Sequence, residues 1–515
     1  MRSQKLDVCR ALTATALSCV ACSGGDYWLG GGAGPGASIP PGAIELGQDT
    51  VLSGGESVEI GGGAESCRIF GNGHSIVSQG TFSGNLWIHD CVFTGLGSEQ
   101  SAAIDVDVSN PGSVIIERST FAASGAIQIT NSDDTATTFQ NNVVYDDSVV
   151  TLGATADATT PAFQAFGASQ AQKLFQGNRI YRSDVWLGSP NWLMGGDTDA
   201  QSNLLIGIRA GIFLSASGQV VRGNYVHDEH LAVAGDESSL DADYSVTDTL
   251  AEHNVLRRGA WVVRGFGGEF RYNAVLDADN LSLFQQPFEN THVHHNLFVM
   301  CEPAIDGAAI QGGLQVVNAR AVGIEIYNNT FDGGGAAIGF GGPAISVDAD
   351  CLLASLRSNL FANFSFAANA GDAAIRPGAT ESSLPMPARL GYADYNLFDN
   401  QSQVTLRNYG LSVDGKNERT DPGFALNDAH AGGPIDQQVM PNLTGASNCF
   451  AFSDDDIRAG NVTVSQMLAA LRDAYSPLPG SPPLGAGDPQ DGAGNFIGAV
   501  GDGALAADLF GRFGP

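Results

Sequence analysis

One short phrase recurs through the middle of the chain and restricts the fold more than any other feature of the sequence. The phrase is an apolar residue, two polar residues, Asn, any residue and an apolar residue, as in FQGNRI. Its Asn residues are Asn178, Asn224, Asn254, Asn273, Asn296, Asn329, Asn359 and Asn396, with Asn203 in a weaker copy. Repeats of about 20 to 45 residues are typical of solenoids, in which each repeat contacts only its neighbours.

The runs between the Asn phrases read as strands. GIFLSAS and GAWVVRG are short and β-like, and the 3.6-residue apolar period of a helical repeat is not visible. We therefore predict an all-β solenoid of short three-strand coils, stacked in parallel about 4.8 Å apart. Asn suits a turn near the left-handed region, and stacked Asn side chains form hydrogen bonds from coil to coil. A β-propeller or a sandwich is the alternative, which the irregular spacing and the Asn column disfavour.

The sequence resembles the right-handed parallel β-helix of the pectate-lyase-like superfamily over residues 46–400. IFGNGHSI at 69–76 is similar to a phrase common in the first coils of such helices. TDPGF at 420–424 and GSPPLGAGDP at 480–489 resemble the tail of many bacterial β-helix proteins. These motifs imply the fold and say little about activity.

The N-terminus reads as an export signal over residues 1–22. Basic residues precede the apolar run ALTATALSCVA, which is too short to span a bilayer. The segment resembles a bacterial lipoprotein signal with Cys22 as the lipidated residue. Cys19 is the fallback, and an ordinary secretory peptide is the other interpretation. We expect an exported protein, either a surface or outer-membrane lipoprotein or a secreted one.

The remaining chain divides by composition. A Gly/Pro-rich linker is expected over 23–45, the β-helix over 46–400 and a C-terminal cap or tail over 401–515. Within that tail, NVTVSQMLAALRDAYS at 461–476 is predicted to be a helix that serves as a cap or a lateral cover over the last coil. Five cysteines remain after the signal, and we expect buried thiols or one or two disulfides. Cys67–Cys91 is the most plausible pair.

The net charge of the chain restricts which binding partners we expect. The formal net charge is −31, which argues against nucleic acid and against anionic membrane surfaces. An acidic polysaccharide would need a local basic patch or a bridging cation such as Ca²⁺. We expect a monomer whose only membrane contact is an N-terminal lipid anchor.

The repeat also predicts which side chains face outward. With the Asn as position zero, positions −3 and +2 are apolar and face the core, so positions −4 and −2 face outward. One outward column then contains Arg222, Glu252, Arg271, His294, Tyr327, Arg357 and Asp394, and the other contains Glu269, His292 and Glu325. His294 and His295 are strand neighbours, so their side chains are expected to diverge and not to form a chelate.

These columns predict a candidate site. Its catalytic candidates are Arg264, Glu269, Arg271, His292, His294 and Glu325. Its substrate-binding candidates are Arg222, Arg257, Arg258 and Tyr327, with Trp186 and Trp192 as possible platforms for sugar rings. The alternative interpretation is a ladder of cross-strand polar pairs that keeps one face soluble.

An acidic loop follows Asn224. Asp236, Glu237, Asp241 and Asp243 could hold Ca²⁺ through carboxylate oxygens, although their spacing matches no EF-hand or nonapeptide repeat. The loop is otherwise a solvated acidic segment.

Proteins of the resembled superfamily often bind long polysaccharides, and the lyases among them act on uronates. In those lyases a base removes the proton α to a uronate carboxylate while calcium or Arg neutralises that carboxylate. The candidate site offers Arg264 or Arg271 for the carboxylate and His292 or His294 as the base, although no family motif carries these roles over residue by residue. LWIHDCVF differs from the corresponding lyase phrase because His89 and Asp90 are in swapped order, and the hydrolase and esterase phrases are absent. We expect an exported polysaccharide-binding protein, either a lyase (less plausibly a glycoside hydrolase) or a noncatalytic, adhesin-like surface protein.

Overall fold

The computed structural model contains the full chain and describes part of it. The described residues are 44–61, 67–98, 101–145, 162–181, 183–207, 211–227, 239–242, 247–264, 267–284, 291–300, 314–317, 322–332, 345–347, 352–362, 375–377, 393–394, 396–399, 412–413, 416–417, 452–476, 487–488 and 496–500. The predicted signal with Cys19 and Cys22, and nearly all of the linker, lie outside these residues. Within them, no helix is both long enough and apolar enough to cross a membrane.

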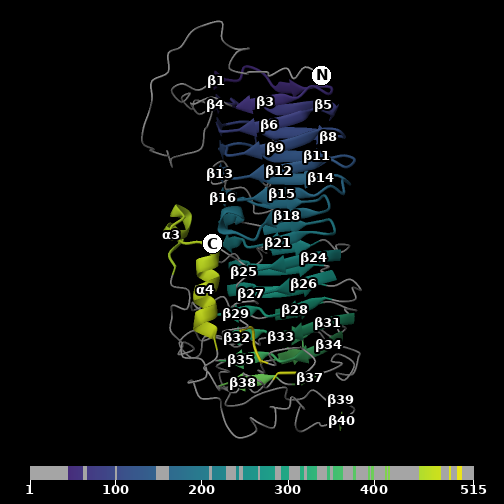
Figure 1. The fold of residues 1–515 in the computed structure, drawn as a ribbon, viewed down its shortest axis with the longest axis vertical. Helices are drawn as coiled ribbons and strands as arrows, with labels where there is room; N and C mark the ends of the chain where they lie inside the picture. The colour runs from purple at the N-terminus through teal and green to yellow at the C-terminus, as the bar shows by residue number, and fades with distance from the viewer. Residues whose placement is uncertain are drawn as a thin grey trace. The chain divides into compact units, whose positions relative to one another are not determined.

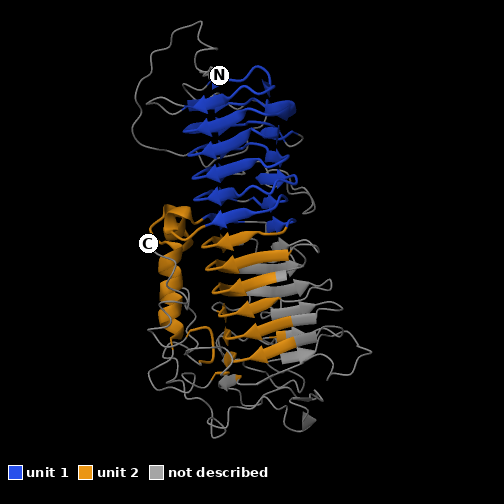
Figure 2. Cartoon of the chain, turned by 45° about the vertical axis from the view of Figure 1, so that its right-hand side comes forward, with its two compact units in different colours: residues 1–195, 203–216 blue, residues 196–202, 217–515 orange. Residues whose placement is uncertain are grey.

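The chain is almost entirely β and forms a right-handed parallel β-helix, as the repeat predicts (Figure 1). It divides into two compact units (Figure 2). Unit 1 contains residues 1–195 and 203–216, and unit 2 contains residues 196–202 and 217–515.

Unit 1 is built from three parallel sheets, which we name 1A, 1B and 1C. Each coil contributes one short strand to each sheet. Sheet 1A contains β1 (Ile44–Glu45), β4 (Cys67–Phe70), β7 (Cys91–Thr94), β10 (Thr120–Ala122), β13 (Val143–Tyr145), β16 (Arg179–Tyr181) and β19 (Leu204–Ile206). Sheet 1B contains β2 (Thr50–Leu52), β5 (Ile76–Phe82), β8 (Ile104–Val108), β11 (Ile127–Asn131), β14 (Phe163–Phe166), β17 (Val185–Leu187) and β20 (Gly211–Leu214). Sheet 1C contains β3 (Val58–Gly61), β6 (Asn85–His89), β9 (Ser113–Glu117), β12 (Ala136–Gln140), β15 (Lys173–Gln176) and β18 (Trp192–Gly195).

Unit 2 has two parallel sheets, 2A and 2C, and a few further elements. Sheet 2A contains β22 (Tyr225–His227), β25 (Val255–Arg264), β27 (Ala274–Phe284), β29 (Leu297–Val299), β30 (Leu314–Val317), β32 (Thr330–Asp332), β33 (Ile345–Val347), β35 (Leu360–Ala362), β36 (Ile375–Pro377) and β38 (Leu397–Asp399). Sheet 2C contains β21 (Val220–Arg222), β24 (Thr247–Glu252), β26 (Gly267–Arg271), β28 (His292–His294), β31 (Val322–Tyr327), β34 (Leu352–Arg357) and β37 (Ala393–Asp394). The others are η2 (Asp199–Gln201), β23 (Ser239–Ala242), β39 (Ser412–Val413), β40 (Lys416–Asn417), α3 (Asp454–Ala459) and α4 (Val464–Tyr475).

The repeated Asn residues form hydrogen-bonded ladders inside the coils, as predicted. In unit 2, the side-chain amide of Asn296 donates to Asn329 Oδ1 at 3.0 Å and to the Phe270 carbonyl at 2.8 Å. The next rungs repeat this pattern through Asn359 to Asn396. In unit 1 the ladder joins Asn142, Asn178 and Asn203, and Asn142 was missed as a member of the repeat.

The left-handed turn lies one residue earlier than predicted. The residue before the ladder Asn has a positive φ on many coils, including His253 (55°), Tyr272 (54°), His295 (55°), Asn328 (51°) and Ser358 (54°). The side-chain amide of the ladder Asn forms hydrogen bonds to both neighbouring coils, while the residue before it makes the turn. The assignment of the turn to the Asn was wrong.

The core of each coil is filled by the inward-facing residues of the repeat. Phe298, Phe331 and Phe361 are the position +2 residues of consecutive coils in unit 2, and their rings stack with centroids 4.7 and 5.0 Å apart. In unit 1, Cys67 and Cys91 face each other on β4 and β7 and form the predicted disulfide.

Helix α4 confirms the predicted helix at 461–476. Thr463 and Gln466 form a capping box at its start. Val464, Met467, Leu468, Leu471 and Tyr475 form its buried stripe, with the spacing of one helix face. Within unit 2 the helix lies along sheet 2A (Figure 1), where the Tyr475 hydroxyl donates to Asp332 Oδ2 of β32 at 2.7 Å. It covers the flank of several coils.

Candidate functional site

The outer face of sheet 2C carries the polar columns that the repeat predicts. Strand pairing places Glu252, Arg271, His294 and Tyr327 side by side on successive coils. The same pairing places Glu269, His292 and Glu325 in the second column. We call these residues, together with Arg357, the 2C patch.

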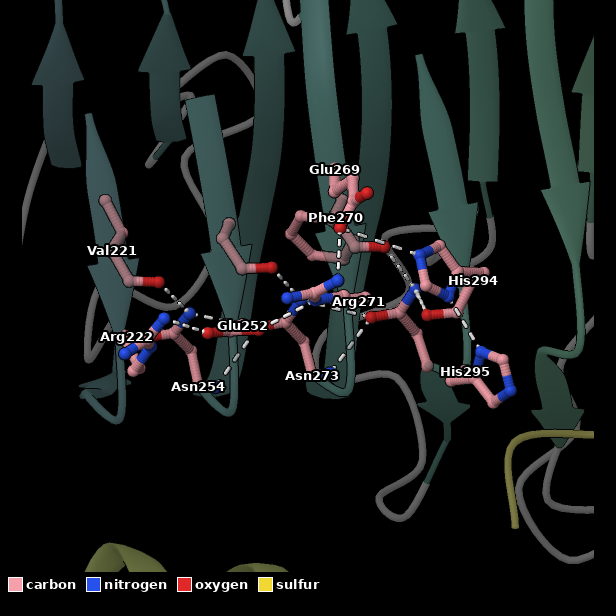
Figure 3. A network of polar contacts seen from close by, with 12 residues as sticks. Val221, Arg222, Glu252, Asn254, Glu269, Phe270, Arg271, Asn273, His294 and His295 are labelled. Atoms are coloured by element: carbon pink, nitrogen blue, oxygen red, sulfur yellow. Dashed lines mark hydrogen bonds and ion pairs between the residues drawn. The ribbon is translucent and has the colours of Figure 1, made fainter. Parts of the chain in front are cut away.

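The arginines of the 2C patch are held by glutamates (Figure 3). Arg271 Nε donates to Glu252 Oε2 at 2.7 Å, and its Nη1 pairs with Glu269. Arg222 also pairs with Glu252, which is buried. Because each guanidinium already meets carboxylates, its charge is largely neutralised within the sheet.

His294 lies buried in the middle of its column, with 6% of its surface exposed. Its ring stacks on Tyr327 with centroids 4.6 Å apart and planes 4° apart. The Arg357 guanidinium lies over the same Tyr327 ring, 4.3 Å from the centroid. Burial, together with the charges of His295, Arg271, His292 and Arg357, lowers the pKa of His294 to about 2. His294 is therefore neutral near pH 7 and a weak base.

The prediction that His294 and His295 diverge was wrong. Their Nδ1 atoms lie 2.7 Å apart (Figure 3), within hydrogen-bonding distance. The left-handed φ of His295 turns the chain at this point, so the alternation of a regular strand no longer applies. Burial, followed by the charge of Arg271, lowers the pKa of His295 to about 3. Two neutral imidazoles in opposite tautomers share one hydrogen across this contact.

His292 is the more accessible imidazole of the 2C patch. Its side chain is 34% exposed, and its Nδ1 lies 3.9 Å from Glu325 Oε2. Glu325 also accepts a hydrogen bond from Arg357 Nη1 at 3.0 Å. Of the two histidines expected to act as a base, the geometry therefore favours His292 over His294.

Several predicted residues lie away from the 2C patch. Arg257 is buried on sheet 2A, where its Nη1 donates to Asp454 Oδ1 of α3 at 2.8 Å, so the structure places its guanidinium in an internal ion pair and away from the 2C patch. The side chains of Arg258 and Arg264 lie outside the described residues, although their backbones belong to β25. Arg222 is the member of this group that stays on sheet 2C.

The predicted calcium loop is not tested. Asp236, Glu237 and Asp243 lie outside the described residues, and only the backbone of Asp241 is described, in β23. No group of three or more metal-ligating side chains occurs in the parts of the chain that the structure describes.

The two tryptophans predicted to stack on sugars lie in unit 1 and have opposite environments. Trp192 is 1% exposed and its Nε1 donates to Ser189 Oγ at 2.9 Å, so the structure places it in the core and not on an outer face. Trp186 points outward from β17 and is 37% exposed. In short strands the direction of one side chain sets the direction of the next, and Val185 and Leu187 are both buried.

Trp186 belongs to an aromatic row on the outer face of sheet 1B. Phe166 of β14 meets it edge-on at a centroid distance of 5.3 Å, and Phe213 of β20 lies 6.1 Å away on the next coil. Trp186 Nε1 donates to Ser215 Oγ at 2.8 Å, which fixes the indole. We call Phe166, Trp186 and Phe213 the aromatic row. Sequence reasoning missed both phenylalanines, although the alternation in FQAF and GIFL indicated them.

A polar column continues from the aromatic row. Gln128 pairs with Gln164, and Gln164 pairs with Trp186, on successive strands of sheet 1B. Both glutamines are half-buried. The face therefore combines an aromatic surface with amide groups that can donate to and accept from hydroxyls.

No family model and no curated protein matches this chain. Two solved structures are similar, the periplasmic alginate epimerase AlgG and a threonine-to-asparagine mutant of it. They cover 64% and 68% of this chain and 74% and 73% of their own chains, at 9% identity and a TM-score of 0.26. A likeness at this level carries no argument about the site.

Proposed function

We propose that this protein is an exported β-helix protein that binds a polysaccharide without chemically changing it. The aromatic row on sheet 1B is the observation that supports polysaccharide binding. An aromatic face attracts the C–H groups of a pyranose through its negative quadrupole, and it does so best where the ring is held in place and exposed. Trp186 meets both conditions, since it is 37% exposed and bonded to Ser215.

The 2C patch supports the noncatalytic part of the proposal. A catalytic cation must be available to the charge that develops in the substrate. Arg271 is instead engaged by Glu252 and Glu269, and Arg357 by Glu325. A catalytic base works best with a pKa near the working pH, whereas the pKa of His294 is lowered to about 2. The geometry of the 2C patch is more typical of cross-strand polar pairs that keep one face soluble than of an active site.

Calorimetric titration of the full-length protein tests the proposal. The ligands are a panel of neutral and uronate polysaccharides, each with and without a chelator. We expect binding by the wild type and about tenfold weaker binding by Trp186→Ala, the loss that follows when a stacked ring is removed. Val51→Ala is the matched control because Val51 is also exposed on sheet 1B, at 53%. Equal affinity of Trp186→Ala and wild type would contradict the proposal.

A uronate lyase is the second candidate, and the exposure of His292 favours it. His292 would remove the proton α to the uronate carboxylate, and Arg357, which shares its charge with Glu325, would face the carboxylate. The glycosidic C4–O bond then breaks as the C4–C5 double bond forms, and the departing oxygen takes a proton from water. The measurement is the ultraviolet absorbance of the unsaturated product on uronate polysaccharides. Activity in the wild type that is lost in His292→Ala would establish the lyase. Product formation at the wild-type rate in His292→Ala would exclude this mechanism.

A further inference from the structure

A second exposed tryptophan lies on a different face of unit 1, among residues that have no role so far. Trp87 of β6 points outward from sheet 1C and is 38% exposed. Its indole stacks on the ring of His89 with centroids 4.0 Å apart and planes 26° apart. Its Nε1 donates to Glu117 Oε1 of the next coil at 3.1 Å.

These two contacts set the orientation of the indole. Trp87 and His89 are two residues apart on one strand, and Glu117 is the cross-strand neighbour of His89. The indole therefore extends over His89 toward Glu117. The buried His89 covers one face of the indole, while Trp87 as a whole stays 38% exposed.

Several independent contacts hold the His89 ring in place beneath the Trp87 indole. His89 Nδ1 lies 2.8 Å from Asp90 Oδ2, and its Nε2 lies 3.4 Å from Glu59 Oε1. Gly61 is the strand neighbour of His89 on the preceding coil, where a Cβ would lie 2.1 Å from the His89 carbonyl oxygen. A glycine is therefore needed for His89 to hold its place under the indole.

The charges around the ring limit what it can bind. The stacked rings of Trp87 and His89 are surrounded by three carboxylates, those of Glu59, Asp90 and Glu117. Arg118 pairs with both Asp90 and Glu117. Burial acts to raise the pKa of Glu117, but hydrogen bonds from Gln140, Trp87 and Arg118 outweigh it and lower the pKa. Glu117 is thus ionised, and the rim carries excess negative charge that would repel a uronate.

An exposed aromatic ring surrounded by carboxylates is better suited to bind a sugar than to bind another protein. Protein interfaces place aromatic anchors among apolar neighbours that exclude water. Here the large exposed apolar side chains among the described residues are Val51, Trp87 and Trp186, which form no contiguous patch around Trp87. Carboxylates beside a ring face instead accept hydrogen bonds from sugar hydroxyls while the ring takes the apolar face of the sugar.

We propose that Trp87, framed by Glu59 and Asp90, is a binding subsite for an uncharged pyranose residue of a glycan. The subsite is separate from the aromatic row, which lies on sheet 1B, and does not depend on it. A chain with both subsites would hold neutral glycan on two faces of unit 1.

The experiment isolates this subsite in the full-length Trp186→Ala variant, so that the aromatic row no longer contributes. Cellohexaose, mannohexaose and hexagalacturonate are titrated into three proteins by calorimetry: Trp186→Ala, Trp186→Ala with Trp87→Ala, and Trp186→Ala with Val51→Ala. We expect Trp186→Ala to bind a neutral hexaose, the Val51 change to have no effect, and the Trp87 change to weaken binding about tenfold or more. Trp87→Phe keeps a ring on His89 and is expected to give an intermediate loss.

Three outcomes would overturn the proposal. They are equal affinity with and without Trp87, no binding of either neutral hexaose to Trp186→Ala, and tighter binding of hexagalacturonate than of both neutral hexaoses. Thermal unfolding of each variant shows whether the Trp87 change has unfolded the protein, and Trp87→Phe then supplies the result. If the aromatic row does not bind glycan, Trp186→Ala behaves as the wild type and the Trp87 comparison still gives its answer.

Discussion

At the scale of single residues, the 2C patch shows how a conspicuous histidine cluster can serve the fold. His294 and His295 lie close enough to share a hydrogen, and His294 is stacked on Tyr327 in the middle of its column. Both imidazoles have lost most of their contact with water, and both pKa values are lowered as a result. A protonated imidazole is therefore strongly disfavoured in this folded structure.

This neutrality predicts a dependence of stability on pH. An unfolded His takes up a proton near pH 6.5, whereas folded His294 does so only near pH 2. Between these values the unfolded state binds more protons, so the free energy of unfolding falls as the pH falls below 6.5. From pH 7 to pH 5 we expect this loss to be smaller by about 2 kcal/mol in His294→Gln than in wild type.

Urea unfolding at both pH values measures the difference. Between pH 7 and pH 9 neither folded nor unfolded His294 gains a proton, so the difference between the two proteins is expected to stay constant there. A wild type and a His294→Gln variant that lose the same stability on acidification would show that His294 is not held neutral.

At the scale of elements, the Asn ladder joins the coils of each unit. Asn296 is fully buried, and its amide bonds Asn329, the Phe270 carbonyl and the His294 carbonyl, while its oxygen accepts from the backbone N–H of Asn273. These bonds engage buried groups on both neighbouring coils. The ladder thus stabilises the stack by satisfying backbone groups at the turn.

Replacing one ladder residue should therefore cost more than replacing an exposed Asn. Asn296→Ala removes the hydrogen bonds to buried groups such as the Asn273 N–H and the Phe270 carbonyl, at about 1–3 kcal/mol for each group left unsatisfied, so we expect a loss of about 3 kcal/mol or more. Asn85→Ala is the matched control, because exposed Asn85 bonds only side chains at the surface, and it should cost under about 0.5 kcal/mol. The urea midpoints of the two variants give the comparison. Similar midpoints would argue against a stabilising ladder.

Helix α4 supplies a second test at this scale. The Tyr475 hydroxyl is buried against Asp332, and burial next to that carboxylate raises the pKa of Tyr475 well above its usual value. Tyr475→Phe removes one hydrogen-bond donor from a buried carboxylate and should cost about 1–3 kcal/mol. We expect faster proteolytic cleavage near α4 in this variant and unchanged cleavage in Arg472→Ala, since Arg472 pairs at the surface with Asp473. Equal cleavage of all three proteins would contradict this role of the hydroxyl.

The register was predictable because it depends on local rules. Strand alternation and the Asn column together place Glu269 beside His292 and His292 beside Glu325, as found. The conformation of His295 was not predictable, because a left-handed residue at the end of a strand breaks the alternation. The pairing of Arg257 with Asp454 joins residues 197 positions apart, which no repeat specifies.

The directions of the tryptophan side chains were not predictable either. Both Trp186 and Trp192 lie in short strands of unit 1, and the sequence offered no Asn phrase close enough to fix their direction. Trp186 points outward and Trp192 inward. LWIHDCVF resembles a lyase phrase through its His and Asp residues, and nothing in that phrase predicts that the Trp87 indole stacks on His89.

At the scale of the whole molecule, the distribution of charge separates the two proposals about glycans from the lyase alternative. The chain carries a formal net charge of −31, and the arginines described on sheet 2C are paired with glutamates. Anionic glycans therefore meet repulsion over most of the surface, whereas neutral glycans depend on local stacking alone. The exposed indoles on sheets 1B and 1C are the features of the described surface that suit neutral glycans best.

The most direct test of polysaccharide binding on these faces observes the indoles themselves. The full-length protein is labelled with 5-fluorotryptophan, and its five tryptophans are assigned by single Trp→Phe variants. Fluorine NMR spectra are then recorded with and without a saturating neutral polysaccharide. We predict that the signals of Trp186 and Trp87 shift or broaden while buried Trp192 stays unchanged. A polysaccharide that binds by calorimetry and moves neither Trp186 nor Trp87, or the absence of any binding, would contradict the account.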